Sequence, residues 1–305
     1  MTRRAGVVLA LVAAVVSGVA VFINAYGVKA VGDATVYTTA KNLVAALLLG
    51  AVFAVTLGRR ASSTSRTPRT PLSRGQLAGL VAMGIGGSVP FVLFFEGLLR
   101  ASSVHAAFLH KTLVLWVALL AVPLLRERLT WAHGVAIALL LVGQTVLVGG
   151  VTESFGPGEA MILAATMLWA VETVLAKWLL GGLSSWSVGV ARMGLGSLVL
   201  LAWVGVTGRF GALVALDAAQ WGWVLLTGAV LASYVGLWLA ALARAQAVDV
   251  TAVLVLAAVV TAVLAALVTG TTLQPVGLLL VLAGGALAVV RLRPASGVAV
   301  GAGGA

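Results

Sequence analysis

Long apolar runs alternate with short polar segments along the whole chain, and these runs define the elements that the sequence predicts. A helix needs about 20 apolar residues to cross the hydrocarbon core of a bilayer, and the runs predict ten such helices. Their approximate boundaries are 5–27, 36–58, 76–99, 103–124, 131–149, 158–180, 186–206, 220–243, 248–269 and 274–292. We therefore expect an all-α polytopic membrane protein with ten transmembrane helices.

The second half of this pattern repeats the first. Arg100 and Arg244 each follow an apolar segment with an aromatic cluster, and each precedes another long apolar run. Lys41 and Arg192 likewise each stand early in an apolar stretch. Because five is an odd number of spans, the two halves must insert in opposite orientations, as in many secondary transporters. The predicted parts are a first repeat, a second inverted repeat and a disordered cytoplasmic tail, with boundaries 1–150, 151–293 and 294–305.

The composition indicates that the chain lies in a membrane, and it excludes several kinds of site. The chain is 62% hydrophobic and only 9% charged, whereas soluble domains carry about 25% charged residues. The absence of cysteine excludes a disulfide framework and thiolate metal sites, and the three histidines have no metal-ligand spacing. We therefore expect no metal, no cofactor and no catalytic residues. The net charge of +11 lies mostly at the ends of apolar runs, which indicates topology rather than nucleic-acid binding.

Cations mark one side of the membrane. With the N-terminus inside, the cytoplasmic segments collect Arg3, Arg4, Arg59, Arg60, Arg66, Arg69, Arg74, Arg126, Arg128, Lys177, Arg244, Arg291 and Arg293. The outer segments collect only Lys29, Arg100 and Arg209. This asymmetry follows the positive-inside rule, so both termini are expected in the cytoplasm and the protein in the plasma membrane.

Several short segments resemble those of a known transporter family. Residues 96–102 resemble a hairpin between a third and a fourth helix, and residues 124–130 resemble a turn built around Glu127. In the second half, Leu168-Trp169-Ala170 resembles an opening helix, and residues 270–273 stand where the second turn is expected. Through these segments the chain resembles the drug/metabolite transporter superfamily, as a ten-helix member with two EamA-type repeats. The resemblance implies bacterial plasma-membrane efflux of amino acids, related metabolites or drugs.

The chain departs from the pattern of this family at three places. Thr271 stands where the second turn usually has glutamate. The prolines usual in the middle of helices 4 and 9 are missing, with Val114 and Ala258 near those positions. The pair His110-Lys111 is an unusual polar insertion in helix 4.

Ionisable side chains inside the spans are the main functional candidates, because a charge at bilayer depth is costly. They are Lys41, Glu96, Lys111, Glu172 and Arg192. The predicted topology places the first three in the outer half and the last two in the inner half. We hypothesise an outer and an inner polar cluster that break and re-form as the two sides open in turn. The alternative is that each is a static charge-neutralising bridge, since a buried ion pair does not by itself indicate a switch.

Other polar and aromatic residues complete the predicted translocation pathway. His110 acts either as a proton relay or as a hydrogen-bonding partner of a neighbouring helix, which is the commoner role. Asn24 either lines the pathway or bridges helices. Trp169, Tyr234 and Trp238 are deep enough to form an aromatic wall for an organic substrate.

Two acidic residues near the cytoplasmic side are predicted to have structural roles. Glu127 is expected to bind its own loop or the start of helix 5 through the helix dipole. Asp249 is expected to be a helix-terminal residue that caps helix 9.

The function predicted from these features is secondary active export of small organic metabolites, such as amino acids or related compounds, by alternating access. Three candidate cations against two candidate carboxylates favour zwitterionic or anionic substrates over lipophilic cations. The expected partners are a small-molecule substrate, the lipid bilayer and protons as a coupling ion, without nucleic acid, in a monomer or a homodimer. The alternatives are a multidrug efflux transporter, a channel and an intramembrane enzyme, and the last would need a convergent catalytic set.

Overall fold

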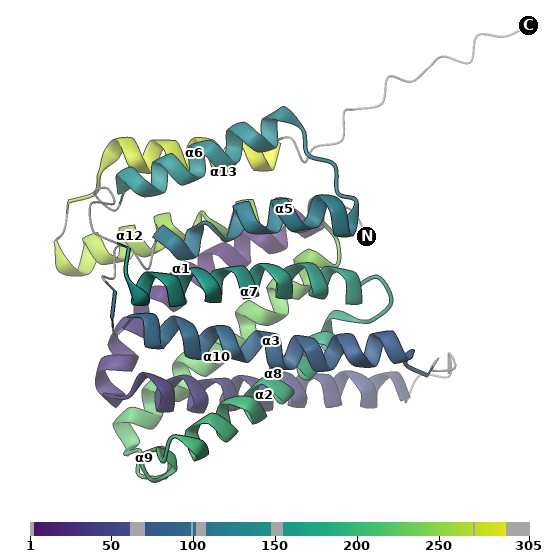
Figure 1. The fold of residues 1–305 in the computed structure, drawn as a ribbon, viewed down its shortest axis with the longest axis vertical. Coiled ribbons are helices and arrows are strands. Elements are labelled where there is room, and N and C mark those ends of the chain that lie inside the picture. The colour runs from purple at the N-terminus through teal and green to yellow at the C-terminus, as the bar shows by residue number, and fades with distance from the viewer. Residues whose placement is uncertain are drawn as a thin grey trace, which may run out of the picture.

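A computed structural model describes residues 3–61, 71–98, 100–101, 108–147, 155–270 and 272–290. Throughout these ranges the regular elements are α-helices (Figure 1). The first half holds α1 (Arg3–Val31), α2 (Ala34–Ala61), α3 (Arg74–Leu98), α5 (Leu113–Leu125) and α6 (Trp131–Leu147). The second half holds α7 (Pro157–Leu179), α8 (Ser185–Val206), α9 (Phe210–Val214), α10 (Ala218–Leu242), α11 (Ala247–Leu254), α12 (Ala257–Thr269) and α13 (Pro275–Val290).

The apolar runs become helices at the predicted places, so the predicted fold class is confirmed. In the described part of the chain, eight helical segments are long and apolar enough to cross a bilayer. One of them joins α5 to the turn before it (Phe108–Leu125), and another joins α11 to α12 (Ala247–Val268). The shorter apolar helices α6 and α13 complete the set. The five-residue α9, which the apolar pattern does not predict, lies in the connection between α8 and α10. The predicted tail, 294–305, falls outside the described residues.

The two halves run in opposite directions through the bundle. In Figure 1, α1 begins at the N label and crosses to the opposite side, whereas α7 runs back toward the side of the N label. We call the side on which α1 begins the N-terminal side, and α13 also ends there. The direction of the chain thus matches an inverted five-helix repeat.

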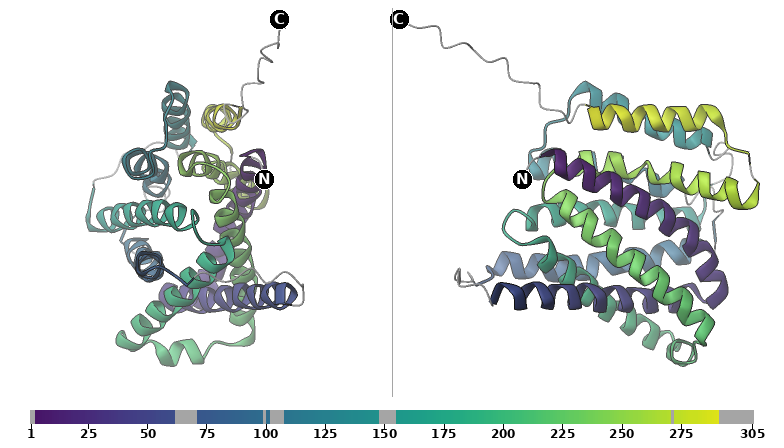
Figure 2. Two further views of the ribbon diagram at one scale, coloured as in Figure 1. Left: turned by 90° about the vertical axis from the view of Figure 1, so that its right-hand side faces the viewer. Right: turned by 180° about the vertical axis from the view of Figure 1, so that it is seen from behind.

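The contacts between helices also follow the inverted repeat, in which the two halves are related by an approximate twofold axis. Matching α1, α2 and α3 with α7, α8 and α10 in order predicts pairs of equivalent contacts. The helix α1 packs on α10 as α3 packs on α7, and α2 packs on α10 as α3 packs on α8. Figure 2 shows α1 and α10 running side by side on the face behind that of Figure 1. Each repeat therefore buries its apolar surface against the other, and a central space is lined by both.

The last helices of the two repeats, α6 and α13, form an outer layer together (Figure 1). A Cβ atom on Gly143 would lie 2.7 Å from the Val281 backbone nitrogen, and one on Gly277 would lie 2.9 Å from the Gly143 carbonyl oxygen. Only glycine permits this close approach of two helix backbones, which is a common way of packing helices in membranes.

The fourth helix of each repeat is interrupted at an equivalent position, although proline is absent there. The first interruption is at Thr112, and the second is the turn at Val255 and Leu256 that separates α11 from α12. Thr112 lies as far beyond Arg100 as Leu256 lies beyond Arg244. The Thr112 hydroxyl donates to the Leu109 carbonyl oxygen at 2.6 Å, and a hydroxyl that binds the backbone in this way competes with the helical ladder.

Candidate substrate cavity

A central cavity of about 190 Å³ lies between the repeats. Its walls come from α1, α2, α3, α7, α8, α10 and α11, together with the start of α5 and the turn before it. Among its lining residues are Asn24, Lys41, His110, Trp169, Glu172, Arg192, Tyr234 and Trp238. The structure thus brings most of the predicted pathway residues around one space, whereas Glu96 and Lys111 do not line it.

One polar group at this cavity is formed by Asn24 and Lys41, which line it, and by Tyr37, which is buried behind them. The Lys41 ammonium donates to Asn24 Oδ1 at 3.0 Å, and the Tyr37 hydroxyl donates to the same oxygen at 2.7 Å. The Asn24 amide nitrogen donates to the Ala20 carbonyl oxygen at 2.7 Å, which fixes the orientation of the amide. The ammonium also lies 5.0 Å from the centre of the Tyr37 ring and 5.5 Å from that of Phe95. Such cation–π contacts stabilise a positive charge without an anion.

The second polar group is an ion pair between α7 and α8. Arg192 Nε donates to Glu172 Oε1, and Arg192 Nη2 donates to Glu172 Oε2 at 3.3 Å. The guanidinium group also lies 5.5 Å from the centre of the Trp238 ring. A Cβ atom on Gly87 would come within 2.9 Å of Glu172 Oε1, so a glycine of α3 leaves the space that the carboxylate occupies. The structure thus pairs the two residues that the predicted topology assigns to an inner cluster.

The predicted outer cluster does not form. Glu96 pairs instead with Arg100, whose Nη1 lies 2.8 Å from Glu96 Oε2, and this interaction is on the surface. The two residues are four positions apart at the end of α3, where side chains with this spacing lie next to each other. No ion pair joins Lys41 or Lys111 to Glu96 in the described part of the chain.

Aromatic rings line one wall of the cavity. The centre of the Trp169 ring lies 5.0 Å from that of His110 and 5.3 Å from that of Phe91, both in edge-on arrangements. Tyr234 and Trp238 stack with their ring centres 6.4 Å apart. His110 Nδ1 is buried and has no hydrogen-bond partner among the described residues. The predicted hydrogen bond to a neighbouring helix is therefore not found at this nitrogen, and the imidazole instead packs edge-on against the rings of Phe94 and Trp169.

Two stretches that together cover most of the chain match a single family model. The model of the EamA-like transporter family matches residues 4–149 and residues 156–290. The chain belongs to the EamA-like transporter family. It is accordingly a multi-pass membrane transporter, with a small-molecule substrate and the lipid bilayer as its surroundings.

Solved structures show the same fold as this EamA-family chain. Twenty-nine chains match it, and one of them is described only as a crystal structure of protein. That structure aligns with a TM-score of 0.72 and 17% sequence identity, over 95% of this chain and 100% of its own. Such low identity establishes the fold alone. A comparison with curated proteins gives no match.

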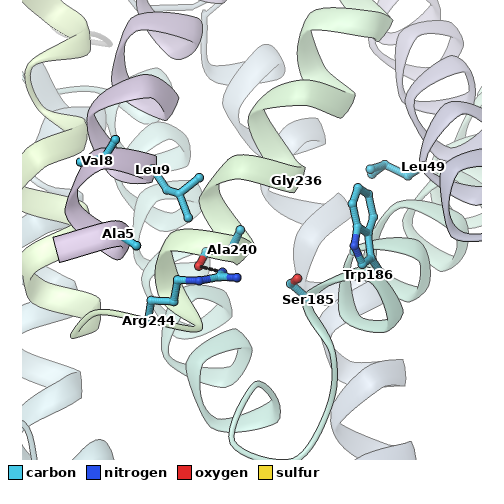
Figure 3. A pocket seen from close by; sticks show the side chains of 10 residues that line it. Ala5, Val8, Leu9, Leu49, Ser185, Trp186, Gly236, Ala240 and Arg244 are labelled. Carbon is cyan, nitrogen blue, oxygen red and sulfur yellow. Dashed lines mark hydrogen bonds between the residues drawn. The ribbon is translucent and has the colours of Figure 1, made fainter. Parts of the chain in front are cut away.

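A second, larger space of about 560 Å³ opens on the N-terminal side of this EamA-family bundle (Figure 3). It lies between α1, α2, α8 and α10, which also line the central cavity, and its lining residues are Ala5, Val8, Leu9, Leu49, Ser185, Trp186, Gly189, Gly236, Ala240 and Arg244. Fully buried Ala13 of α1 and Ala45 of α2 lie, along their helices, between the residues of the two spaces. We call the larger space the N-terminal groove.

Two carboxylates near this side of the EamA fold bind across the repeats, which the sequence did not predict. Glu127 accepts the backbone N–H groups of Ala247 at 2.6 Å and Val248 at 3.2 Å. The prediction that it binds its own loop or the start of helix 5 is wrong, because the unpaired N–H groups at the start of α11 face it instead. Asp249 lies in the first turn of α11, as expected of a helix-terminal residue, although Gln246 and not Asp249 holds the N-cap position.

The Asp249 carboxylate lies 3.1 Å from His133 Nε2 of α6. The opposite ring nitrogen, His133 Nδ1, accepts the Thr130 backbone N–H at 3.0 Å. From α7, the Lys177 ammonium donates to the carbonyl oxygens of Leu242 at 2.6 Å and Ala245 at 2.7 Å. These hydrogen bonds stabilise the turn between α10 and α11. In the sequence, the signal for them is the presence of polar residues near the ends of spans.

Proposed function

We propose that this protein is a secondary active transporter that exports small organic metabolites, such as amino acids or related compounds, across the plasma membrane. The observation that carries the proposal is one central cavity, built by both repeats and lined by Lys41, Glu172 and Arg192. Charged side chains at bilayer depth are costly and mark substrate pathways.

The arrangement of spaces along four helices supports alternating access. The central cavity and the N-terminal groove share α1, α2, α8 and α10, and small buried residues close the path between them. A change in the packing of these helices would open the cavity toward the groove. The Glu172–Arg192 pair lies on α7 and α8, one of which belongs to this group, so such a change would alter the geometry of the pair.

The proposed direction of transport and the orientation of the protein in the membrane are inferred from the distribution of charge. Among the described residues, the cations at helix ends are concentrated on the N-terminal side, and by the positive-inside rule we infer that this side faces the cytoplasm. The N-terminal groove is in that case the cytoplasmic entrance, as an exporter needs. Protons are proposed as the coupling ion because an ionisable pair, the Glu172 carboxylate with the Arg192 guanidinium, lines the cavity, and carboxylates inside membrane spans are typical of proton-driven transporters.

Transport by purified protein in liposomes tests the proposal. Cells with and without the protein are screened for metabolites that they release, and the best candidate is loaded into proteoliposomes with and without a pH gradient. We expect saturable flux and counterflow, with loss of flux in Glu172→Gln. Arg128→Gln is the matched control, because Arg128 is exposed and outside both spaces. A current that does not saturate and shows no counterflow would indicate a channel instead.

A further inference from the structure

Lys41 is a buried cation whose neighbours in the described chain are uncharged. Its residue is only 4% exposed, and it faces the central cavity. Its hydrogen-bond acceptor is the neutral amide oxygen of Asn24, and its other close neighbours are the faces of two aromatic rings. An ammonium group has three N–H donors, and the bond to Asn24 uses one of them.

The corresponding cation of the second repeat has a different kind of partner. Lys41 and Arg192 stand in equivalent stretches of α2 and α8. Each binds a side chain on the first helix of its own repeat, Asn24 on α1 and Glu172 on α7. The acceptor is a neutral amide in one repeat and a carboxylate in the other, so the second repeat supplies its cation with an anion and the first repeat does not.

We propose that the central cavity binds small organic carboxylates, with the carboxylate of the substrate pairing with the ammonium of Lys41. The substrate thereby supplies to Lys41 the negative charge that Glu172 supplies to Arg192. This inference rests on the proposed transport function, because it names the substrate class of the same cavity. Burial strengthens a charge-assisted hydrogen bond of this kind.

The rest of the cavity defines the remainder of the ligand. Phe91, Trp169, Tyr234 and Trp238 provide an aromatic wall, which suits a flat or apolar body. A volume of about 190 Å³ equals about six water molecules at about 30 Å³ each, so the ligand is small. Glu172 is occupied by Arg192, and an ammonium group on the substrate is therefore not required.

Four probes that share a phenyl ring test this assignment. Phenylpropionate and L-phenylalanine carry a carboxylate, whereas L-phenylalaninamide and phenethylamine do not. Binding is measured on the purified full chain in detergent by calorimetry and by the ligand-induced rise in unfolding temperature. We expect phenylpropionate and L-phenylalanine to bind at least tenfold more tightly than L-phenylalaninamide and phenethylamine. Phenylpropionate should bind about as well as L-phenylalanine.

Three variants locate the selectivity at Lys41. Lys41→Met removes the charge, and Asn24→Asp keeps the size of the side chain while it supplies the ammonium with a permanent carboxylate. Each should weaken phenylpropionate binding at least tenfold, whereas Lys41→Arg should retain most of it. Arg128→Gln should bind as the wild type does, and the unfolding temperature without ligand shows that each variant is folded.

The outcomes separate this proposal from the transport function. Equal binding of all four probes, binding of neither carboxylate, or unchanged carboxylate binding in folded Lys41→Met or Asn24→Asp protein would overturn the carboxylate site. Selective carboxylate binding without any flux in proteoliposomes would support the site and contradict the transport function. Flux of a metabolite that lacks a carboxylate, at equal rates in wild-type and Lys41→Met protein, would support the transport function and contradict the carboxylate site.

Discussion

Glu127 accepts the backbone N–H of Ala247 at 2.6 Å, so an acidic side chain of the first repeat completes the start of a helix in the second. The carboxylate is buried and also accepts the N–H of Val248. A negative charge at a helix N-terminus is favourable both as a hydrogen-bond acceptor and through the helix dipole.

Removal of this carboxylate should destabilise the protein. We expect Glu127→Ala to lower the free energy of unfolding by about 1–3 kcal/mol, because two buried N–H groups lose their acceptor. Glu127→Gln should have a smaller effect, since its amide oxygen still accepts a hydrogen bond. Thermal unfolding in detergent measures both, and Glu127→Ala protein that unfolds at the wild-type temperature would contradict the cap.

His133 and Asp249 should be energetically coupled. His133 Nδ1 accepts the Thr130 N–H, so the ring proton is on Nε2 and points at the Asp249 carboxylate. A double-mutant cycle of His133→Phe and Asp249→Asn should give a coupling of about 0.5–3 kcal/mol, as for other residues in one hydrogen-bond network. A cycle in which the two single effects simply add would show that this contact is not formed in the membrane protein.

The Glu172–Arg192 pair can be tested as a gate or a static bridge. Loss of one partner leaves a buried charge unpaired, which costs about 3–5 kcal/mol, so Glu172→Gln and Arg192→Met should each lower the unfolding temperature. The double variant should recover much of this loss. If the pair gates transport, the double variant folds but does not transport.

A static bridge predicts the opposite result for the double variant, with near-normal flux in proteoliposomes once folding is restored. Normal flux in both single variants, with normal insertion, would exclude any role of the pair in transport.

Blocking the N-terminal groove should block transport without harming the fold. Gly236 lines the groove on α10, and a Cβ atom there would lie 4.0 Å from Leu49 Cδ2. Gly236→Ala should therefore be tolerated, with a small gain in stability of up to about 1 kcal/mol from helix propensity. Gly236→Phe should fill the groove and reduce flux at least tenfold, while substrate binding in the central cavity stays within about twofold. Normal flux in Gly236→Phe protein would place the route elsewhere.

The sequence predicts the scaffold well because the bilayer makes strict demands on it. Apolar runs of spanning length must become helices, and the odd number of runs in each half requires inversion. Lys41 and Arg192 stand at corresponding places in the two halves of the sequence, so their equivalence could be predicted without the structure. The pair of Glu96 with Arg100 was also within reach, since it follows from a spacing of four residues in one helix.

Other contacts depend on how the repeats pack and leave little trace in the sequence. Glu127 and Ala247 are 120 positions apart, and His133 and Asp249 are 116 positions apart. Only the docking of α11 against α5 and α6 brings them together. The interruption at Thr112 was also missed, because a threonine hydroxyl competes for a backbone carbonyl only in some rotamers, whereas a proline always lacks the backbone N–H that the helix interior needs.

Because Glu127 of the first half caps α11 of the second half, neither half can replace the other. Position 271, where the second half would need its own glutamate, holds threonine. A complex of two second halves would therefore start each α11 without a carboxylate, and two first halves would hold an acid with no α11 to receive it. Split between 150 and 156, the chain should assemble only when both fragments are produced in the same cell.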